Sequence, residues 1–464
     1  MASTYLSRTP SSAGNRKTWT WSGWVKRSSV SGSSDYPRLF CASTSSTDRV
    51  EFYFRPDDKL QAEIVIGNTG RNLITERVFR DLSAWYHIVL AVDTTLNTSD
   101  DRIKLFINGE RITNIVSGET MPNQNDDTAV NNNVEHRIGN SVIYNTRYHN
   151  GLMAHVHLID GTAYDASYFG QTDATTGIWK PKTTPSVSYG TNGFFLKFEN
   201  SGNMGLDSSG NSNNFTVSGS MTQSISTPSN IFANISPLYN FGAGMSISNN
   251  NSTVANSSGS NAWQMEACSH GFTKGKYYFE YKMTALGLNN GYHKLGFISD
   301  VNSGHNSAVH LAESAVDGGY AFYNSGGNLE VRTDDNVITG YDQSTLGVSF
   351  TTNDIMCLAI DKTNNRVYFR KNDDAWIKSA DPVAGTNGLD ISSDYTTDKL
   401  LVPAIAQYGS GSVGSFNFGE GFFGTTAVAS AGTSTSGDDS IWEYDCPSGY
   451  YGLNTKNINA QEYS

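Results

Sequence analysis

The chain has 464 residues, more than one hydrophobic core usually organises, so we expect two domains with connecting material. Charged residues make up 16% and aromatic residues 12%, and glycine, serine, threonine and asparagine are plentiful, which is typical of a turn-rich all-β protein and unlike a disordered chain. The formal net charge of −12 argues against nucleic-acid binding, which needs clustered lysine and arginine. No apolar run approaches the roughly 18 residues of a membrane span, and the first residues lack the apolar segment of a secretory signal.

The first predicted strand lies within residues 16–25, where Trp19, Trp21 and Val25 are evenly spaced and can share one face. Asp57-Asp58 predicts a turn. Three further strands are predicted around it: 38–43, 50–55 and 59–66.

The clearest local signal is a hairpin within residues 85–112. Residues 87–92 are almost continuously apolar, as in a strand buried on both faces, and residues 102–107 alternate between polar and apolar. Asn108-Gly109 follows, the strongest short signal for a type I′ turn. The pattern recurs at residues 355–370, which indicates two sandwiches. We expect the inward side chains of both hairpins to be buried: Val89, Ala91, Ile103, Leu105, Ile107, Leu358, Ile360, Val367 and Phe369.

A polar loop (117–133), two strands (135–143 and 151–159) and one helical turn (165–172) complete the first domain. We expect Asp165 to cap that turn, with Tyr168 and Phe169 on its apolar side.

Histidines and acidic loops raise the question of a metal site. His155 and His157 are two residues apart on one predicted strand, near His149 and Asp160, a spacing that a transition metal would use. Half-exposed strand histidines are the more frequent explanation, and we favour it. Oxygen-rich loops suit calcium, although aspartate and asparagine also fill turns for local reasons. These loops are 100–101, 123–127 and 334–335. We assign no metal residue and no cofactor, with calcium left open.

Five motifs in the first domain resemble those of laminin-G-like, concanavalin A-type jelly rolls. They cover roughly residues 15–170 and read TWTWSGWVK, LSAWYHIVLAVDTT, RIKLFINGERI, HRIGNSV and YHNGLMAHVHLID. The resemblance implies the fold but not a ligand, because this fold hosts binders of glycans and of proteins.

Residues 177–214 contain two prolines, a predicted strand at 193–199 and a turn-rich tract, and residues 224–260 are rich in serine and asparagine. The first of these segments resembles a connector in virion proteins of tailed bacteriophages, especially those of marine bacteria. A solvated linker and a segment that wraps a neighbouring subunit both remain open.

The second domain carries, in order, GKYYFEYKM, LGFISD, YAFYNSGG, the second hairpin and FNFGE. These motifs resemble those of the SPRY fold, another concanavalin-like sandwich, over residues 262–424. The tail, with PSGYYGLNTKN at 447–457, resembles the closing segment of the same phage proteins. Its aromatic residues indicate that it docks on a surface.

The sequence offers no catalytic residues. A retaining glycosidase of this superfamily would carry a Glu-x-Asp-x-Glu strand, with its outer carboxylates on one face. The nearest match is Glu443-Tyr-Asp445, without a second glutamate, and Glu280 and Glu330 stand alone on their strands. No serine has glycines two residues away on both sides, as a nucleophile elbow requires. Scattered cysteines predict buried, reduced thiols: Cys41, Cys268, Cys357 and Cys446.

We therefore expect an all-β protein of two concanavalin-like jelly-roll β-sandwiches joined by an extended connector. The expected boundaries are 1–180 (laminin-G-like), 181–261 (connector), 262–424 (SPRY-like) and 425–464 (tail). The resemblance implies a non-enzymatic virion surface protein, a fibre, spike or capsid-surface component, that serves as a glycan-binding adhesin for host attachment. Alternatives are a capsid decoration or cementing protein, a glycan-processing enzyme, which the missing carboxylate pair disfavours, and an intracellular SPRY-type adaptor.

The expected partners are other virion proteins, host surface glycans and further copies of the chain, by analogy with phage fibres a trimer, with no nucleic acid and no membrane insertion. Residues 193–240 and 441–457 are expected to contribute to those contacts, and the protein is expected in the virion, assembled in the host cytoplasm. Aromatic rings in polar loops are the candidate glycan contacts: Tyr144, Tyr148, Tyr292 and Tyr341.

Overall fold

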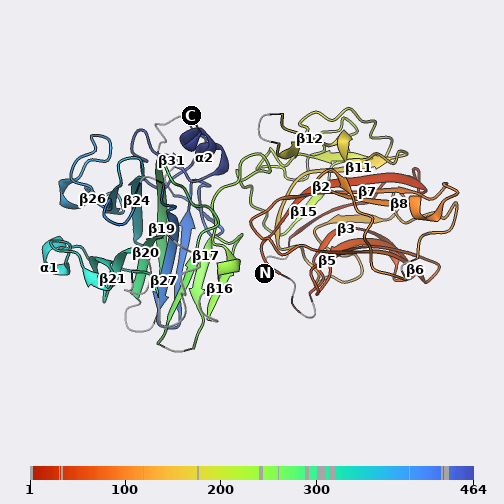
Figure 1. Cartoon of the computed structure of the whole chain (residues 1–464). Helices are drawn as coiled ribbons and strands as arrows, with labels where there is room; N and C mark the ends of the chain where they lie inside the picture. The colour runs from red at the N-terminus through yellow and green to blue at the C-terminus, as the bar shows by residue number, and fades with distance from the viewer. Residues whose placement is uncertain are drawn as a thin grey trace. The chain divides into compact units, whose positions relative to one another are not determined.

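The computed structural model describes residues 4–30, 32, 35–118, 120–174, 177–239, 244–259, 261–287, 292–299, 310–312, 319–396, 398–429, 432 and 438–463. The chain forms two compact units, Met1–Ser229 and Asn230–Ser464, each built from two packed β-sheets (Figure 1). The predicted all-β fold of two β-sandwiches is confirmed. The segment 181–261, which the sequence assigns to a connector, contributes strands to both units.

The first unit has a seven-stranded and a six-stranded sheet, which Figure 1 shows as two layers. The seven-stranded sheet runs β15 (Thr216–Ser218), β1 (Tyr5–Arg8), β10 (Glu135–Ile138), β3 (Arg38–Ser45), β4 (Asp48–Phe54), β5 (Lys59–Ile66), β6 (Thr69–Val78). The six-stranded sheet runs β14 (Phe194–Leu196), β11 (Gly151–Asp160), β2 (Thr18–Arg27), β7 (Tyr86–Asp93), β8 (Ile103–Ile107), β9 (Glu110–Arg111).

The core of the first unit lies between these sheets. Trp19, Trp21 and Val25 of β2 are fully buried in it, as their spacing predicts. The five hairpin residues predicted to be buried are at most 3% exposed, so their burial is confirmed. Ile103, Leu105 and Ile107 lie in this core, whereas Val89 and Ala91 are on the other face of the sheet. Asn108 and Gly109 have φ angles of 50° and 90°, the left-handed values that a type I′ turn needs.

Phe169 and Trp179, which follow β11 in the chain, pack against Val89 and Ile159 of the six-stranded sheet. Phe194 and Leu196 of β14 join the core and pair with β11, so the apolar face of this strand is buried within its own unit. On the opposite face of the sheet, the paired strands β12 (Gly170–Thr172) and β13 (Trp179–Pro181) follow a single 3₁₀ turn, η2 (Ala166–Tyr168), capped by Asp165. The helical turn is thus shorter than predicted. Tyr168 is 40% exposed and does not belong to its apolar side, whereas Phe169 is buried.

The second unit has an eight-stranded and a six-stranded sheet. The larger runs β16 (Met245–Ser248), β17 (Thr253–Asn256), β28 (Ser412–Asn417), β19 (Lys276–Leu286), β24 (Ile355–Asp361), β25 (Arg366–Lys371), β26 (Leu389–Asp390), with β31 (Tyr451–Gly452) beside β19. The smaller runs β18 (Trp263–Ala267), β27 (Val402–Tyr408), β20 (Tyr292–Ile298), β21 (Tyr320–Ser325), β22 (Asn328–Thr333), β23 (Asn336–Val337). The hairpin residues Leu358, Ile360, Val367 and Phe369 are at most 3% exposed, which confirms the second hairpin.

The tail packs on the outer face of the eight-stranded sheet. Trp442 and Tyr450 are fully buried against Tyr278 and Cys357 in a separate apolar cluster. A further short pair, β29 (Phe422–Phe423) and β30 (Thr426–Ala427), precedes them. All four cysteines are buried and free, as predicted.

Among the described residues, the helical segments are η1 (Ser99–Asp101), η2, η3 (Pro237–Tyr239), α1 (Gln343–Leu346), η5 (Ile377–Ser379) and α2 (Thr455–Glu462). Within the described ranges, no helix is long and apolar enough to cross a membrane.

Candidate functional site

Tyrosine rings and guanidinium groups gather on the outer face of the seven-stranded sheet. Side chains alternate along a strand, so Tyr5 and Tyr53 point outward while Leu6 and Phe52 fill the core. We name this patch the Tyr/Arg surface: Tyr5, Tyr36, Tyr53, Tyr144, Tyr148, Arg38, Arg137 and Arg147.

All three arginines in this surface lie over tyrosine rings, Arg38 and Arg147 at the shortest distances. The Arg38 guanidinium carbon is 3.6 Å from the ring centre of Tyr53. The Arg147 guanidinium carbon is 3.8 Å from the ring centre of Tyr144 and 4.6 Å from that of Tyr36. Arginine stacked on an aromatic ring gains a cation–π attraction, so the rings hold these guanidinium groups in place.

Buried charges beneath the surface hold the loop that carries Tyr144. Glu51 is fully buried, accepts a hydrogen bond from Arg38 at 2.9 Å, and accepts another from Ser141. The Ser141 hydroxyl accepts the Tyr144 N–H at 3.0 Å. Burial would raise the pKa of Glu51, but the charge of Arg38 and the two hydrogen bonds outweigh it and lower the pKa. Glu51 is therefore an anionic anchor for the loop.

Arg137 holds the same loop from a second strand. It donates to the Ser141 carbonyl at 2.9 Å and to the Asn145 side chain at 2.8 Å, and it pairs with Glu135. Its guanidinium carbon lies 4.6 Å from the ring centre of Tyr5, which is 6.4 Å from that of Tyr148. The loop thus rests on fixed supports.

The structure brings Tyr144 and Tyr148 of the predicted contacts into one surface. Tyr144 is 37% exposed and available to a ligand. Sequence reasoning missed Tyr36 and Arg147. The run YNTRY at 144–148 places Arg147 between the two predicted tyrosines and could have drawn attention to it, but nothing local points to Tyr36.

Tyr292 belongs to a different patch, on the outer face of the six-stranded sheet of the second unit. Its ring centre lies 5.6–6.3 Å from those of Trp263, Tyr323 and Tyr408. The buried Lys294 ammonium lies 4.7 Å from the Trp263 ring centre and within hydrogen-bond reach, 3.1 Å, of His310 Nδ1.

The patch around Tyr292 already holds a cation. Burial and the Lys294 charge lower the pKa of His310 to about 3, so this ring stays neutral and accepts the ammonium hydrogen bond. Tyr341 lies apart from this patch, beside the Lys378 ammonium at 4.5 Å and partly buried against the core. The four predicted tyrosines are therefore not one site.

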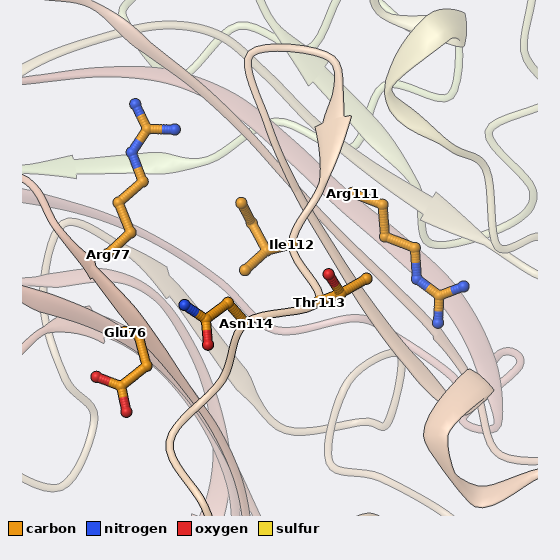
Figure 2. A pocket seen from close by; sticks show the side chains of 6 residues that line it. All are labelled: Glu76, Arg77, Arg111, Ile112, Thr113 and Asn114. Atoms are coloured by element: carbon orange, nitrogen blue, oxygen red, sulfur yellow. The ribbon is translucent and has the colours of Figure 1, made fainter.

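An open pocket of about 410 Å³ lies beside β6 and the segment after β9 (Figure 2). Its polar side chains point away from one another: Arg77, Glu76 and Arg111 diverge around Ile112. Glu76 is paired with Lys59 at 2.7 Å, and Arg111 with Asp101 at 2.9 Å. The pocket lacks the convergent polar groups that orient a small ligand.

Of the histidines considered for a metal, His157 is used structurally, and at 1% exposure it is buried, not half-exposed as expected. The His157 ring stacks on Phe195, with ring centres 4.0 Å apart, and its Nδ1 is 3.0 Å from the Tyr189 hydroxyl. A β-bulge precedes it, and His155 has a φ of 47°, so the regular alternation on which the prediction of a shared face depended is broken. Asp160 accepts N–H groups of the backbone instead. No group of three or more metal-ligating side chains occurs among the described residues.

The acidic loops considered for calcium are likewise engaged locally. Asp101 pairs with Arg111 and Lys104. Asp126 accepts the Asn123 N–H at 2.7 Å. These contacts are those of ordinary turns.

Two arrangements that suggest catalysis also have structural roles. The Glu280 carboxylate is fully buried and accepts four hydrogen bonds, from the N–H groups of Glu443 and Tyr444 and from Asn417 and Tyr278. It therefore ties the tail to the sheet.

A serine–histidine pair, missed by the sequence analysis, lies on the six-stranded sheet. Ser22 Oγ is 3.0 Å from His87 Nε2, but the Trp179 indole N–H donates to His87 Nδ1. Nδ1 is then the acceptor and Nε2 carries the proton, so His87 cannot take a proton from Ser22. Burial also lowers the pKa of His87, to about 3.

Comparison with known proteins bears on the first unit above all. Solved structures similar to parts of the chain include the SPRY domain of human HERC1 (15% identity, 39% of this chain and 96% of that one, TM-score 0.28). Another is a putative carbohydrate binding protein from Bacteroides ovatus (13% identity, 47% of this chain and 56% of that one, TM-score 0.27). A third is domain 4 of AbnA, a GH43 extracellular arabinanase from Geobacillus stearothermophilus, in complex with arabinotriose (15% identity, 32% of this chain and 64% of that one, TM-score 0.25). No curated protein matches the sequence. Residues 2–166, which form much of the first β-sandwich, match the family model described as the concanavalin A-like lectin/glucanases superfamily, and this part of the chain is similar in sequence to that superfamily.

Proposed function

We propose that this protein is a non-enzymatic, glycan-binding protein of a tailed-phage virion surface, where it acts as an adhesin for host attachment. The Tyr/Arg surface carries the binding part of the proposal. Pyranose rings bind proteins by stacking their C–H faces on aromatic rings, while a few polar groups fix the orientation. Tyr144 offers an exposed ring, and Arg147 and Asn145 lie beside it on a loop fixed from below. The match of residues 2–166 to a superfamily described by its lectins and glucanases supports a carbohydrate ligand.

The virion part of the proposal rests on the resemblance of residues 177–214 and 447–457 to phage structural proteins. Other virion proteins would be its partners, and a homo-oligomer, by analogy a trimer, is part of the proposal. Phe194 and Leu196, and Trp442 of the tail, are buried inside their own units. Contacts between subunits would therefore use other surfaces than these side chains. Electron microscopy of intact particles, with the protein located by a specific antibody, tests this placement, and its absence from purified particles would contradict it.

Glycan binding is tested with the full-length protein on an array of neutral and acidic saccharides. We expect binding that Tyr144→Ala weakens about two- to tenfold, because one aromatic–ligand stack is worth about 0.5–1.5 kcal/mol beyond its buried area. Tyr168→Ala is the matched control, since Tyr168 is 40% exposed and lies outside the Tyr/Arg surface. Equal losses for both variants, or no binding to any saccharide, would contradict the proposal.

A further inference from the structure

Arg147 differs from the other arginines of the Tyr/Arg surface in its charge balance. Arg38 is 2.9 Å from Glu51, and Arg137 is 2.9 Å from Glu135. Within the described ranges, the Arg147 guanidinium has neither a hydrogen-bond acceptor nor a carboxylate partner, and only the two tyrosine rings contact it. An unpaired cation is notable in a chain with 44 acidic and 32 basic residues.

Stacking on the tyrosine rings leaves the N–H donors of the Arg147 guanidinium available to a ligand. A guanidinium stacks through its flat face, whereas its five N–H donors lie in the plane and point outward from the edges. Contact with Tyr36 and Tyr144 therefore occupies the face and leaves the donors for a ligand. Such an edge matches the two oxygens of a carboxylate in a bidentate pair.

The position of Arg147 is set before a ligand arrives. Its backbone N–H donates to the Tyr144 carbonyl at 3.0 Å, which closes a turn. Tyr144 is held by Ser141, and Ser141 by the buried Glu51. A fixed guanidinium loses less conformational entropy on binding than a free side chain does.

We infer that Arg147 recognises the carboxylate of an acidic sugar, such as a hexuronic acid, whose ring stacks on Tyr144. This inference rests on the proposed glycan-binding function and names its ligand class. Arg147 covers part of the Tyr144 ring, so the sugar would stack on the exposed part of that ring, with its carboxylate at the adjacent N–H edge. One guanidinium suits one carboxylate, whereas the net charge of −12 disfavours a dense polyanion.

The experiment compares tri-galacturonic acid with its methyl ester by calorimetric titration of the full-length protein. We expect the acid to bind roughly tenfold or more tightly than the ester, and Arg147→Gln to weaken acid binding roughly ten- to a hundredfold, as the loss of a charge-assisted hydrogen bond implies. Arg147→Lys keeps the charge but not the bidentate edge, so we expect an intermediate affinity. Affinity for the ester should stay unchanged in both variants.

Arg71→Gln is the matched control, because Arg71 has no ion pair in the described structure and lies on β6, outside the Tyr/Arg surface. It removes the same charge and should leave binding unchanged. Equal binding of acid and ester, no effect of Arg147→Gln, or binding of sulfated sugars alone would overturn the inference while leaving glycan binding intact. Failure of every saccharide to bind would instead remove the proposed function itself. Unchanged melting of the Arg147 variants shows that they are folded.

Discussion

Glu266 allows a quantitative prediction about stability and pH. It lies on β18 of the second unit, is fully buried, and neither of its carboxyl oxygens has a hydrogen-bond partner among the described residues. Burial raises its pKa from 4.5 to about 9. The folded protein therefore keeps this group protonated at neutral pH, whereas the unfolded chain ionises it.

The sign of the effect follows from proton binding. Between pH 4.5 and about 9, the folded state holds one more proton at Glu266 than the unfolded state does, so stability falls as the pH rises. The slope is about 1.4 kcal/mol per pH unit, which amounts to about 3 kcal/mol at pH 7 relative to pH 4.5. Glu266→Gln is a neutral isostere and removes this slope. We expect the variant to match the wild type near pH 4.5 and to exceed it by about 3 kcal/mol at pH 7.

Urea unfolding followed by tryptophan fluorescence at pH 4.5, 6, 7 and 8.5 measures this difference. The two units unfold as separate transitions if they are independent, and only that of the second unit should respond. Glu76→Gln is the control, because Glu76 lies in the first unit, is exposed and is paired with Lys59. A Glu266→Gln variant with the same pH dependence as the wild type, or with lower stability at pH 7, would refute the reasoning.

Two further predictions concern buried groups, and a third concerns catalysis. Leu105→Asp places an unpaired charge in the core of the first unit, where Leu105 is fully buried, and should lower the stability of that unit by more than about 4 kcal/mol. Circular dichroism should then show no cooperative melting of this unit. Unchanged melting would contradict the assignment of Leu105 to the core face of β8. Glu280→Gln turns an amide NH2 group, which cannot accept hydrogen bonds, toward two of the four donors, and each unpaired donor costs about 1–3 kcal/mol of stability. This variant should be cleaved faster by proteases within residues 441–457. Unaltered cleavage would show that Glu280 does not hold the tail. The wild type should release no reducing sugar from a glycan panel, and a turnover abolished by Glu443→Gln would overturn the non-enzymatic proposal.

Local signals in the sequence were enough to predict both hairpins and several strands, but not β1 or the long strand β6. The Asn108-Gly109 turn and the apolar runs beside it depend on residues that are near neighbours in the chain. The structure after residue 181 was harder to predict, because it depends on contacts between residues that are far apart in the chain. Asp207, for example, arranges a turn by accepting the N–H groups of Phe195 and Asn213, which resembles a solvated polar tract when only composition is considered.

The candidate site shows the same limit. Tyr144 and Tyr148 could be singled out because they are aromatic residues in a polar loop. Tyr36 is brought to Arg147 only by the folding of the sheet, so no local pattern reveals that pair. The supporting Glu51 lies in the middle of a strand that reads as half-exposed, and its burial depends on the loop that covers it.

The four buried thiols have a consequence for where the fold can persist. Burial raises the pKa of Cys41 to about 12 and those of Cys268 and Cys446 well above the ordinary value, which keeps them as thiols. The thiolate is the form that reacts with disulfides and oxidants. A sandwich whose sulfur atoms are neither charged nor reachable does not depend on the redox potential of its surroundings. Its fold therefore relies on no disulfide among these four cysteines, and a reducing agent should leave its stability unchanged.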